Sequence, residues 1–114
     1  MYKICIADDE RYVLKSITQR IESSGMELGV AGTARNGLEA LELYDKIRPD
    51  IYFVDINMPV VNGLDLIDRI RRKDPETATY FIIISGYDDF AYMKKAILLG
   101  VTNYIKKPIS QQEF

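Results

Sequence analysis

The sequence predicts one α/β domain built on a parallel sheet, with helices on both faces of that sheet. Short apolar runs alternate with longer segments whose apolar residues recur with the period of a one-sided helix. Polar residues stand at the carboxyl ends of several apolar runs, where an open α/β sheet keeps its binding site. With 114 residues, 47% of them hydrophobic, the chain is long enough for one domain with a substantial core.

Five apolar segments are expected to form strands. The first is almost entirely apolar, as expected for a strand that is covered on both faces. The second is weaker, because small residues interrupt it. In chain order the five predicted strands are residues 2–7, 28–33, 51–54, 80–84 and 101–105.

The segments between these strands are expected to be helices. The first begins near Glu10, carries an apolar stripe that includes Leu14 and Ile17, and ends at Gly25. Turn or capping residues bound the next three: Asn36-Gly37 and Pro49, then Asn62-Gly63 and Pro75, then Asp88 or Asp89 and Gly100. The inward face of the second helix is predicted to carry Leu38, Leu41, Tyr44 and Ile47.

Strands that alternate with helices predict right-handed crossovers and a flavodoxin-like, doubly wound, five-stranded parallel sheet with strand order 2-1-3-4-5. Residues 110–113 have the spacing of a capping box, so a fifth helix is expected to begin at Ser110. The chain stops at Phe114, and we therefore expect the domain, residues 1–114, to be truncated in its last helix.

Composition excludes several classes of function. A net charge of −2 argues against a nucleic-acid-binding surface on this segment. The single cysteine, Cys5, lies in an apolar run, which excludes a disulfide framework and favours a reducing compartment. No apolar stretch approaches the ~20 residues of a membrane span, and no signal peptide is recognisable. We expect a cytoplasmic protein with no membrane association.

Polar side chains at four strand ends indicate a phosphoryl-transfer site. They are Asp8 and Asp9 after the first strand, Asp55 after the third, Ser85 after the fourth and Lys107 after the fifth. Clustered carboxylates repel one another, and Mg²⁺ relieves that repulsion. The chain has no histidine, so oxygen atoms must hold any metal. A carboxylate can accept a phosphoryl group, and the hydroxyl and ammonium groups suit the remaining phosphoryl oxygens.

Five short motifs are highly specific when their order and spacing are taken together. They are Ala7-Asp8-Asp9-Glu10, Val54-Asp55-Ile56-Asn57-Met58-Pro59, Asn62-Gly63, Ser85-Gly86-Tyr87 and Lys106-Lys107-Pro108. By these motifs the chain resembles the receiver domain of two-component response regulators along essentially its whole length. The resemblance implies that Asp55 is the phosphoacceptor. It also implies that Asp9, Asp55 and the backbone carbonyl of Asn57 bind Mg²⁺ directly, with Asp8 acting mainly through water.

The same resemblance implies a conformational switch. Ser85 would move toward the phosphoryl group, and Lys107 would pair with it. Tyr104 stands where the family places its switch aromatic, and it would turn inward as Ser85 shifts.

The resemblance also implies partners. A cognate sensor histidine kinase would supply the phosphoryl group, and a C-terminal output domain, absent from this chain, would respond. Residues 85–92 with Gly100-Val101 resemble receivers fused to AraC-type helix-turn-helix domains, so DNA-binding transcriptional control would belong to that output domain. A homodimer is one expected phosphorylated form. The domain would not be an enzyme beyond its own phosphorylation and slow dephosphorylation.

Two other classes of function compete with this interpretation. A small hydrolase or phosphotransferase with an aspartyl-phosphate intermediate needs a general acid near Asp55, and Asn57 cannot play that part. A flavodoxin-like module that binds a nucleotide or a partner predicts a glycine-rich phosphate loop after the first strand. The acidic residues 8–10 stand there instead and would repel phosphate.

Overall fold

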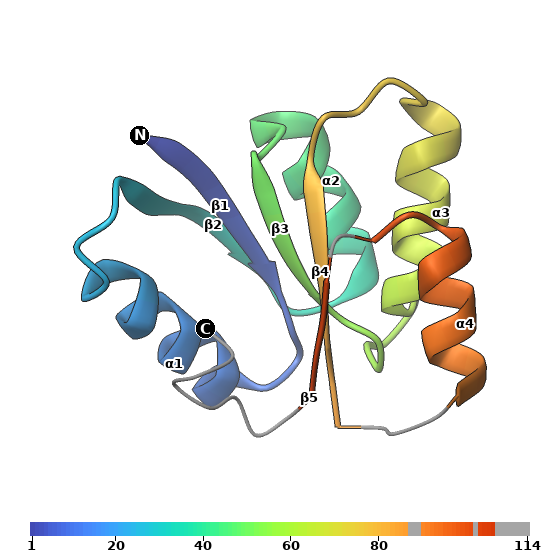
Figure 1. Cartoon of the computed structure of the whole chain (residues 1–114), viewed down its shortest axis with the longest axis horizontal. Coiled ribbons are helices and arrows are strands. Elements are labelled where there is room, and N and C mark those ends of the chain that lie inside the picture. Colours follow the sequence, from blue (N-terminus) through green and yellow to red (C-terminus); the bar gives the residue numbers. More distant parts are fainter. Residues whose placement is uncertain (87–89, 102, 107–114) are drawn as a thin grey trace.

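The computed structural model describes residues 1–86, 90–101 and 103–106, and its account of side chains leaves out residues 90–93, 103, 104 and 106. Strands and helices alternate along the described chain (Figure 1). The elements are β1 (Tyr2–Ala7), α1 (Arg11–Glu22), β2 (Leu28–Ala34), α2 (Gly37–Ile47), β3 (Ile51–Asp55), α3 (Gly63–Lys73), β4 (Tyr80–Ser85), α4 (Phe90–Leu98) and β5 (Asn103–Lys106).

The strands form one parallel sheet in the order β2-β1-β3-β4-β5. The predicted α/β class with a parallel sheet is confirmed. Strands β1 to β4 are described with their side chains, whereas β5 is described mainly by the pairing of its backbone with β4. β5 begins at Asn103 rather than at the predicted Val101, because the Val101 N–H still donates to the Ala96 carbonyl at the end of α4 (3.2 Å). The predicted fifth helix, from Ser110, lies outside the described residues.

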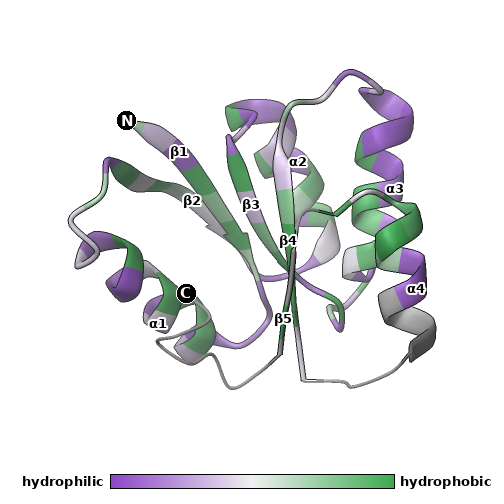
Figure 2. Cartoon of the chain, viewed as in Figure 1, coloured by the Kyte–Doolittle hydropathy of each residue, from purple (hydrophilic) through white to green (hydrophobic). Residues whose placement is uncertain are grey.

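Two buried clusters lie on opposite faces of the sheet. α1 covers one face, and α2, α3 and α4 lie on the other (Figure 1). β3 serves both clusters, because its side chains alternate: Tyr52 and Val54 face the larger cluster and Phe53 faces α1. The apolar colour of the central strands in Figure 2 reflects this burial on both sides.

The two Asn-Gly pairs begin helices as predicted. The Asn36 side chain accepts a hydrogen bond from the Glu39 N–H, and the Asn62 side chain accepts one from the Asp65 N–H, each over 2.9 Å. Each asparagine thereby satisfies an N–H group that has no partner within its own helix.

The helix ends and faces differ from the predictions in two places. α1 ends at Glu22, before Gly25, where the Ser23 hydroxyl donates back to the Gln19 carbonyl (2.8 Å). In α2 the prediction that Leu38 faces inward is wrong, because Leu38 is 54% exposed. The predicted inward residue Tyr44 is buried, together with Gly37 and Ala40, and the predicted Leu41 and Ile47 are partly buried against the larger cluster. The start of α2 is fixed by Gly37, which packs closely against Val61 of a neighbouring loop. No described helix is long and apolar enough to cross a membrane.

Candidate functional site

Strand register brings the predicted site residues to one edge of the sheet. β1 pairs Ala7 with Val54 of β3, so the next residues, Asp8 and Asp55, stand at neighbouring strand ends. β3 pairs Asp55 with Ile84 of β4, which places Ser85 just beyond Asp55 on its other side. This carboxyl edge is the lower edge of the sheet in Figure 1. It is also the edge where open α/β sheets hold their ligands.

Three polar side chains at this edge are almost completely buried. Asp8 and Ser85 are 0% exposed and Asp55 is 3% exposed. A buried carboxylate is costly unless other groups in the protein, or a cation, compensate its charge. Two such carboxylates at adjacent strand ends therefore mark a site with a chemical role rather than a solvated surface.

Asp8, one of these two buried carboxylates, also belongs to a compact acidic cluster. One carboxylate oxygen from each of Asp8, Asp9 and Glu10 lies within 4.8 Å of the other two. A backbone turn holds them together, because the Glu10 N–H donates to Asp8 Oδ1 over 2.9 Å. The Asp8 N–H donates to the Ala34 carbonyl of β2 (3.0 Å) and anchors the turn to the sheet. These are hard oxygen donors, so the set fits an oxygen-binding divalent cation such as Mg²⁺.

Glu10 belongs to this cluster, although it was not among the predicted metal ligands Asp8, Asp9, Asp55 and Asn57. Its signal was adjacency: a third acidic residue directly follows Asp8-Asp9 where the strand turns into α1. The structure groups the Glu10 carboxylate with those two, whereas Asp55 is not a member of this group and stands at the neighbouring strand end by register.

The loop that follows Asp55 carries the predicted ligand Asn57. The loop turns sharply, because the Ile56 carbonyl accepts from both Met58 N–H (3.2 Å) and Gly63 N–H (2.8 Å). Met58 is buried in the larger cluster, whereas Asn57 is exposed at the edge of the sheet. The backbone of Asn57 is therefore held beside Asp55 by its neighbours on both sides.

Two of the predicted residues are not placed by their side chains. Lys107 lies outside the described residues. Tyr104 is described only by its backbone, which pairs with Ile83 in the β4–β5 ladder. The roles of the lysine and of the switch aromatic stay predictions.

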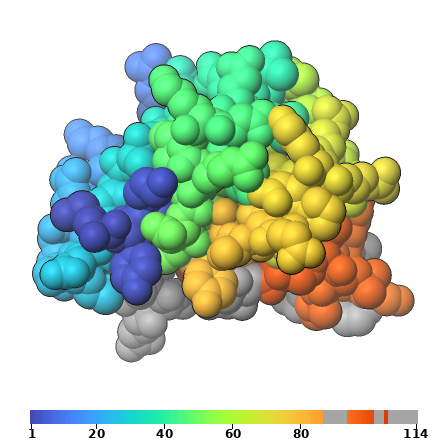
Figure 3. Space-filling model, turned by 90° about the horizontal axis from the view of Figure 1, so that it is seen from above, coloured from blue at the N-terminus to red at the C-terminus, as the bar shows by residue number. Residues whose placement is uncertain are grey.

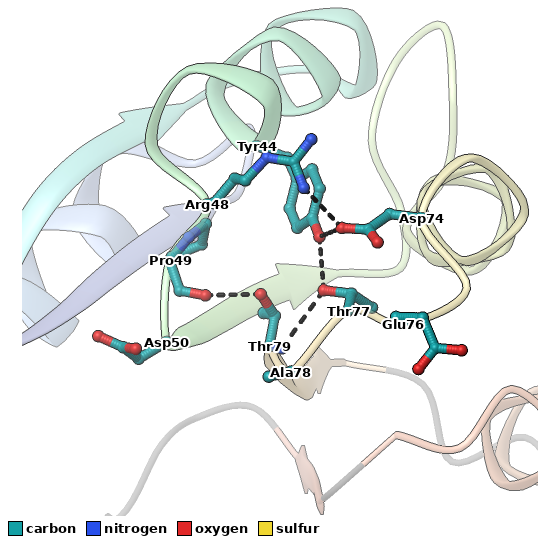
Figure 4. A pocket seen from close by; sticks show the side chains of 9 residues that line it. All are labelled: Tyr44, Arg48, Pro49, Asp50, Asp74, Glu76, Thr77, Ala78 and Thr79. Carbon is teal, nitrogen blue, oxygen red and sulfur yellow. Dashed lines mark hydrogen bonds and ion pairs between the residues drawn. The ribbon is translucent and has the colours of Figure 1, made fainter.

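A cavity of about 320 Å³ lies at the opposite, amino-terminal end of the strands. Figure 3 looks onto this end, and Figure 4 shows the cavity closely. Its polar groups bond to one another: the Tyr44 hydroxyl and the Arg48 guanidinium both reach Asp74, and the Thr79 hydroxyl donates to the Pro49 carbonyl. This end is a polar joint between the end of α2 and the segment before β4.

Comparison with known proteins gives the family. Residues 4–114 match the model of the response regulator receiver domain. The chain therefore belongs to the family of response regulator receiver domains, as its motifs predicted.

Curated relatives extend over nearly all of the chain. The uncharacterized transcriptional regulatory protein YesN of Bacillus subtilis is 38% identical over 113 residues, which are 99% of this chain and 30% of YesN. The transcriptional regulatory protein HptR of Staphylococcus aureus is 37% identical over 99% of this chain and 43% of HptR. The chain thus spans less than half the length of these relatives.

Solved structures show the same fold. The receiver (REC) domain of AraT, a response regulator from Geobacillus stearothermophilus, is 40% identical with a TM-score of 0.85, covering 97% of this chain and 84% of that one. A chain of the CheX–CheY–BeF₃–Mg²⁺ complex from Borrelia burgdorferi is 27% identical with a TM-score of 0.89, covering 98% and 82%.

Proposed function

We propose that this domain is a phosphorylation-dependent switch of a two-component system, with Asp55 as its phosphoacceptor. The observation that carries the proposal is the burial of Asp55 at a strand end, next to the Asp8-Asp9-Glu10 cluster. A carboxylate held at the carboxyl edge of a parallel sheet faces the position where ligands of such sheets bind. In the transfer, an Asp55 oxygen forms a bond to phosphorus while the bond from phosphorus to a histidine nitrogen of the kinase breaks.

Mg²⁺ is the proposed cofactor. The carboxylates of Asp9 and Asp55 and the backbone carbonyl of Asn57 would hold the ion directly, and Asp8 would act mainly through water. When bound, the ion supplies positive charge for the phosphoryl oxygens. Glu10 lies close enough to Asp8 and Asp9 to add to the negative potential that attracts a cation.

The remaining residues have proposed roles in reading the phosphoryl group. Ser85 is buried at the end of β4, beside Asp55, where its hydroxyl suits one phosphoryl oxygen. Lys107 follows Lys106 in the sequence, and Lys106 pairs with Ser85 in the β4–β5 ladder. The proposed role of Lys107 is to pair with the phosphoryl group. Tyr104 would turn inward as Ser85 shifts, and this movement would alter the surface formed by α4 and β5.

The proposed output is transcriptional control by an attached domain. YesN and HptR are transcriptional regulators, and each is more than twice as long as the segment that this chain matches. A sensor histidine kinase is the proposed phosphoryl donor, and the output domain, of the AraC-type helix-turn-helix class, would make the DNA contacts. Phosphorylation would favour a homodimer, and the protein would act in the cytoplasm. Beyond its own phosphorylation and slow dephosphorylation the domain would have no enzyme activity.

Intact mass after incubation with acetyl phosphate and Mg²⁺ tests the proposal. We expect one added phosphoryl group on the unsubstituted chain, and none when EDTA removes the metal. Asp55→Asn keeps the shape of the side chain but removes the nucleophile, so it should gain nothing. Asp68→Asn, a partly exposed position on α3, serves as the matched control and should be labelled normally. Equal labelling of the Asp55 variant would refute the assignment of the nucleophile.

A further inference from the structure

The start of α2 packs directly against the loop between β3 and α3. The Gly37 N–H donates to the Pro59 carbonyl over 3.2 Å. A Cβ atom at Gly37 would lie 2.2 Å from the Val61 carbonyl oxygen and 2.4 Å from Val61 Cβ. The nearest of these atoms belongs to the backbone, so it cannot rotate away as the end of a flexible side chain would. Any side chain at position 37 must displace the loop.

The other end of this loop is held just as closely. A Cβ atom at Gly63, the first residue of α3, would lie 2.2 Å from the Asp55 carbonyl oxygen. The Gly63 N–H also donates to the Ile56 carbonyl (2.8 Å). Residues 56–62 therefore span two close backbone contacts, one with α2 and one with the end of β3.

The backbone of the loop between these contacts is tightly constrained. Val61 N–H donates to the Pro59 carbonyl over 2.9 Å, around Val60, whose φ is +72°. Such a tight turn is strained for a β-branched residue and persists only when its surroundings impose it. Met58 and Val61 are both buried in the larger core cluster. A shift forced on Val61 would therefore be expected to reach Asn57 along the loop.

We infer that Gly37 is a positioning residue for the metal site at the carboxyl edge. Gly37 acts through the loop: its contact with Pro59 and Val61 sets where the Asn57 backbone stands relative to Asp55. The inference rests on the proposed function, because it requires that Asn57 and Asp55 take part in binding Mg²⁺. Outer groups that orient metal ligands commonly change metal affinity about 10- to 100-fold when they are altered.

The test compares Gly37→Ala with Gly32→Ala. Gly32, on β2, is also crowded, since a Cβ atom there would lie 2.6 Å from Leu43 Cδ1, but this contact lies away from the loop. Mg²⁺ affinity is measured by titration calorimetry at a temperature where circular dichroism shows both variants folded. We expect Gly37→Ala to bind Mg²⁺ about tenfold more weakly than the unsubstituted chain. Gly32→Ala should keep the original affinity, because the Leu43 methyl group that it meets is the end of a flexible side chain and can move aside.

A measurement on the unsubstituted chain covers the case in which Gly37→Ala does not fold. If the contact sets the site, Mg²⁺ binding must reciprocally stabilise the contact. The exchange rate of the Gly37 amide hydrogen should therefore fall when Mg²⁺ is added, whereas that of the amide of the partly buried Val30 in β2 should not change. Unchanged exchange at Gly37 in a chain that binds Mg²⁺, or unchanged affinity in folded Gly37→Ala, overturns the inference alone. Absence of Mg²⁺ binding by the unsubstituted chain would overturn the proposed function as well.

Discussion

The hydroxyl of Tyr44 on α2 donates a hydrogen bond to Asp74 Oδ2 at the end of α3, over 2.9 Å. The Arg48 guanidinium reaches the same oxygen at 2.7 Å and lies 5.8 Å from the centroid of the Tyr44 ring. The Tyr44 hydroxyl also bonds to the hydroxyl of Thr77. One phenol thus joins the end of α2 to the segment before β4, far from the carboxyl edge (Figure 4).

Tyr44→Phe should lower the stability of the domain without affecting the proposed phosphorylation of Asp55. The substitution leaves Asp74 and Thr77 each without one partner, which typically costs about 1–2 kcal/mol. Urea unfolding measures this loss, and Tyr80→Phe, at an exposed tyrosine, is the control expected to change little. Equal stability of both variants would mean that the network contributes nothing. Reduced labelling by acetyl phosphate in Tyr44→Phe would contradict the separation of this network from the acidic edge.

The Cys5 thiol should be unreactive in the folded protein and should make stability fall at alkaline pH. Burial raises the pKa of Cys5 from 9.0 to about 11, an effect that the nearby Lys3 partly offsets. A folded-state pKa above the unfolded one means that the unfolded chain loses its proton first as the pH rises. The contribution of the Cys5 thiol to the free energy of unfolding is therefore complete below pH 9 and is lost progressively between pH 9 and about 11.

Two measurements check this prediction. Iodoacetamide at pH 8 should add no mass until urea unfolds the chain, because only the thiolate reacts and Cys5 is buried. Cys5→Ala should show a shallower decline of stability between pH 9 and 11 than the unsubstituted chain. Parallel declines would show that other groups cause the alkaline loss.

Val60→Gly should stabilise the domain relative to Val60→Ala. The φ of +72° at Val60 suits glycine and strains any residue that has a Cβ atom. Strain of this kind costs about 1–3 kcal/mol, whereas the extra unfolded-state freedom of glycine costs about 0.4–1 kcal/mol. The Val60 side chain is 80% exposed, so truncating it removes little buried contact. If Val60→Ala unfolds at a higher temperature than Val60→Gly, the backbone at Val60 is not strained.

Arg71→Met should loosen α4. Arg71 on α3 donates to the Gly100 carbonyl (2.9 Å), and its guanidinium lies 5.1 Å from the centroid of the Phe81 ring. Among the side chains of α4 that the structure describes, residues 94–98, only Ala96 is buried, so the bond from Arg71 to Gly100 is one of the few described contacts that hold this end of the helix. We expect faster amide exchange in residues 94–100 and a loss of stability of about 1–2 kcal/mol.

The matched control for this variant is Arg72→Met. Arg72 pairs with Asp68 on the surface of the same helix, and exposed pairs of this kind contribute little. Exchange in α4 should be unchanged in that variant. If both arginine variants give the same exchange pattern, the contact with Gly100 does not hold α4.

The sequence predicted the strands well because burial on both faces leaves an unbroken apolar signal. Residues 51–54 and 80–84 each formed a strand one residue longer than predicted, ending at Asp55 and Ser85. Helix starts were predicted equally well, because a capping asparagine bonds to a backbone N–H only three residues further along the chain. Leu38 was misplaced because the rotation of α2 depends on a contact with a loop more than twenty residues away.

The candidate site was predictable for a related reason. Asp8 and Asp9 are adjacent in the chain, and the topology of a parallel sheet brings Asp55 and Ser85 to the same edge. Gly37 and Gly63, which confine the loop after Asp55, were predicted only as residues that begin helices, apart from the place of Asn62-Gly63 among the family motifs. Their crowding is a property of three-dimensional packing, which no local pattern records.

The polar joint around Tyr44 and the acidic edge around Asp55 lie at opposite ends of the same strands. Substitutions at the joint should change how much folded protein a cell retains, because modest losses of stability alter abundance. Substitutions at the acidic edge should change how strongly each molecule responds. The amount of folded protein and the response of each molecule would therefore be separately adjustable in this domain. The effects of variants at the two ends on stability should combine nearly additively.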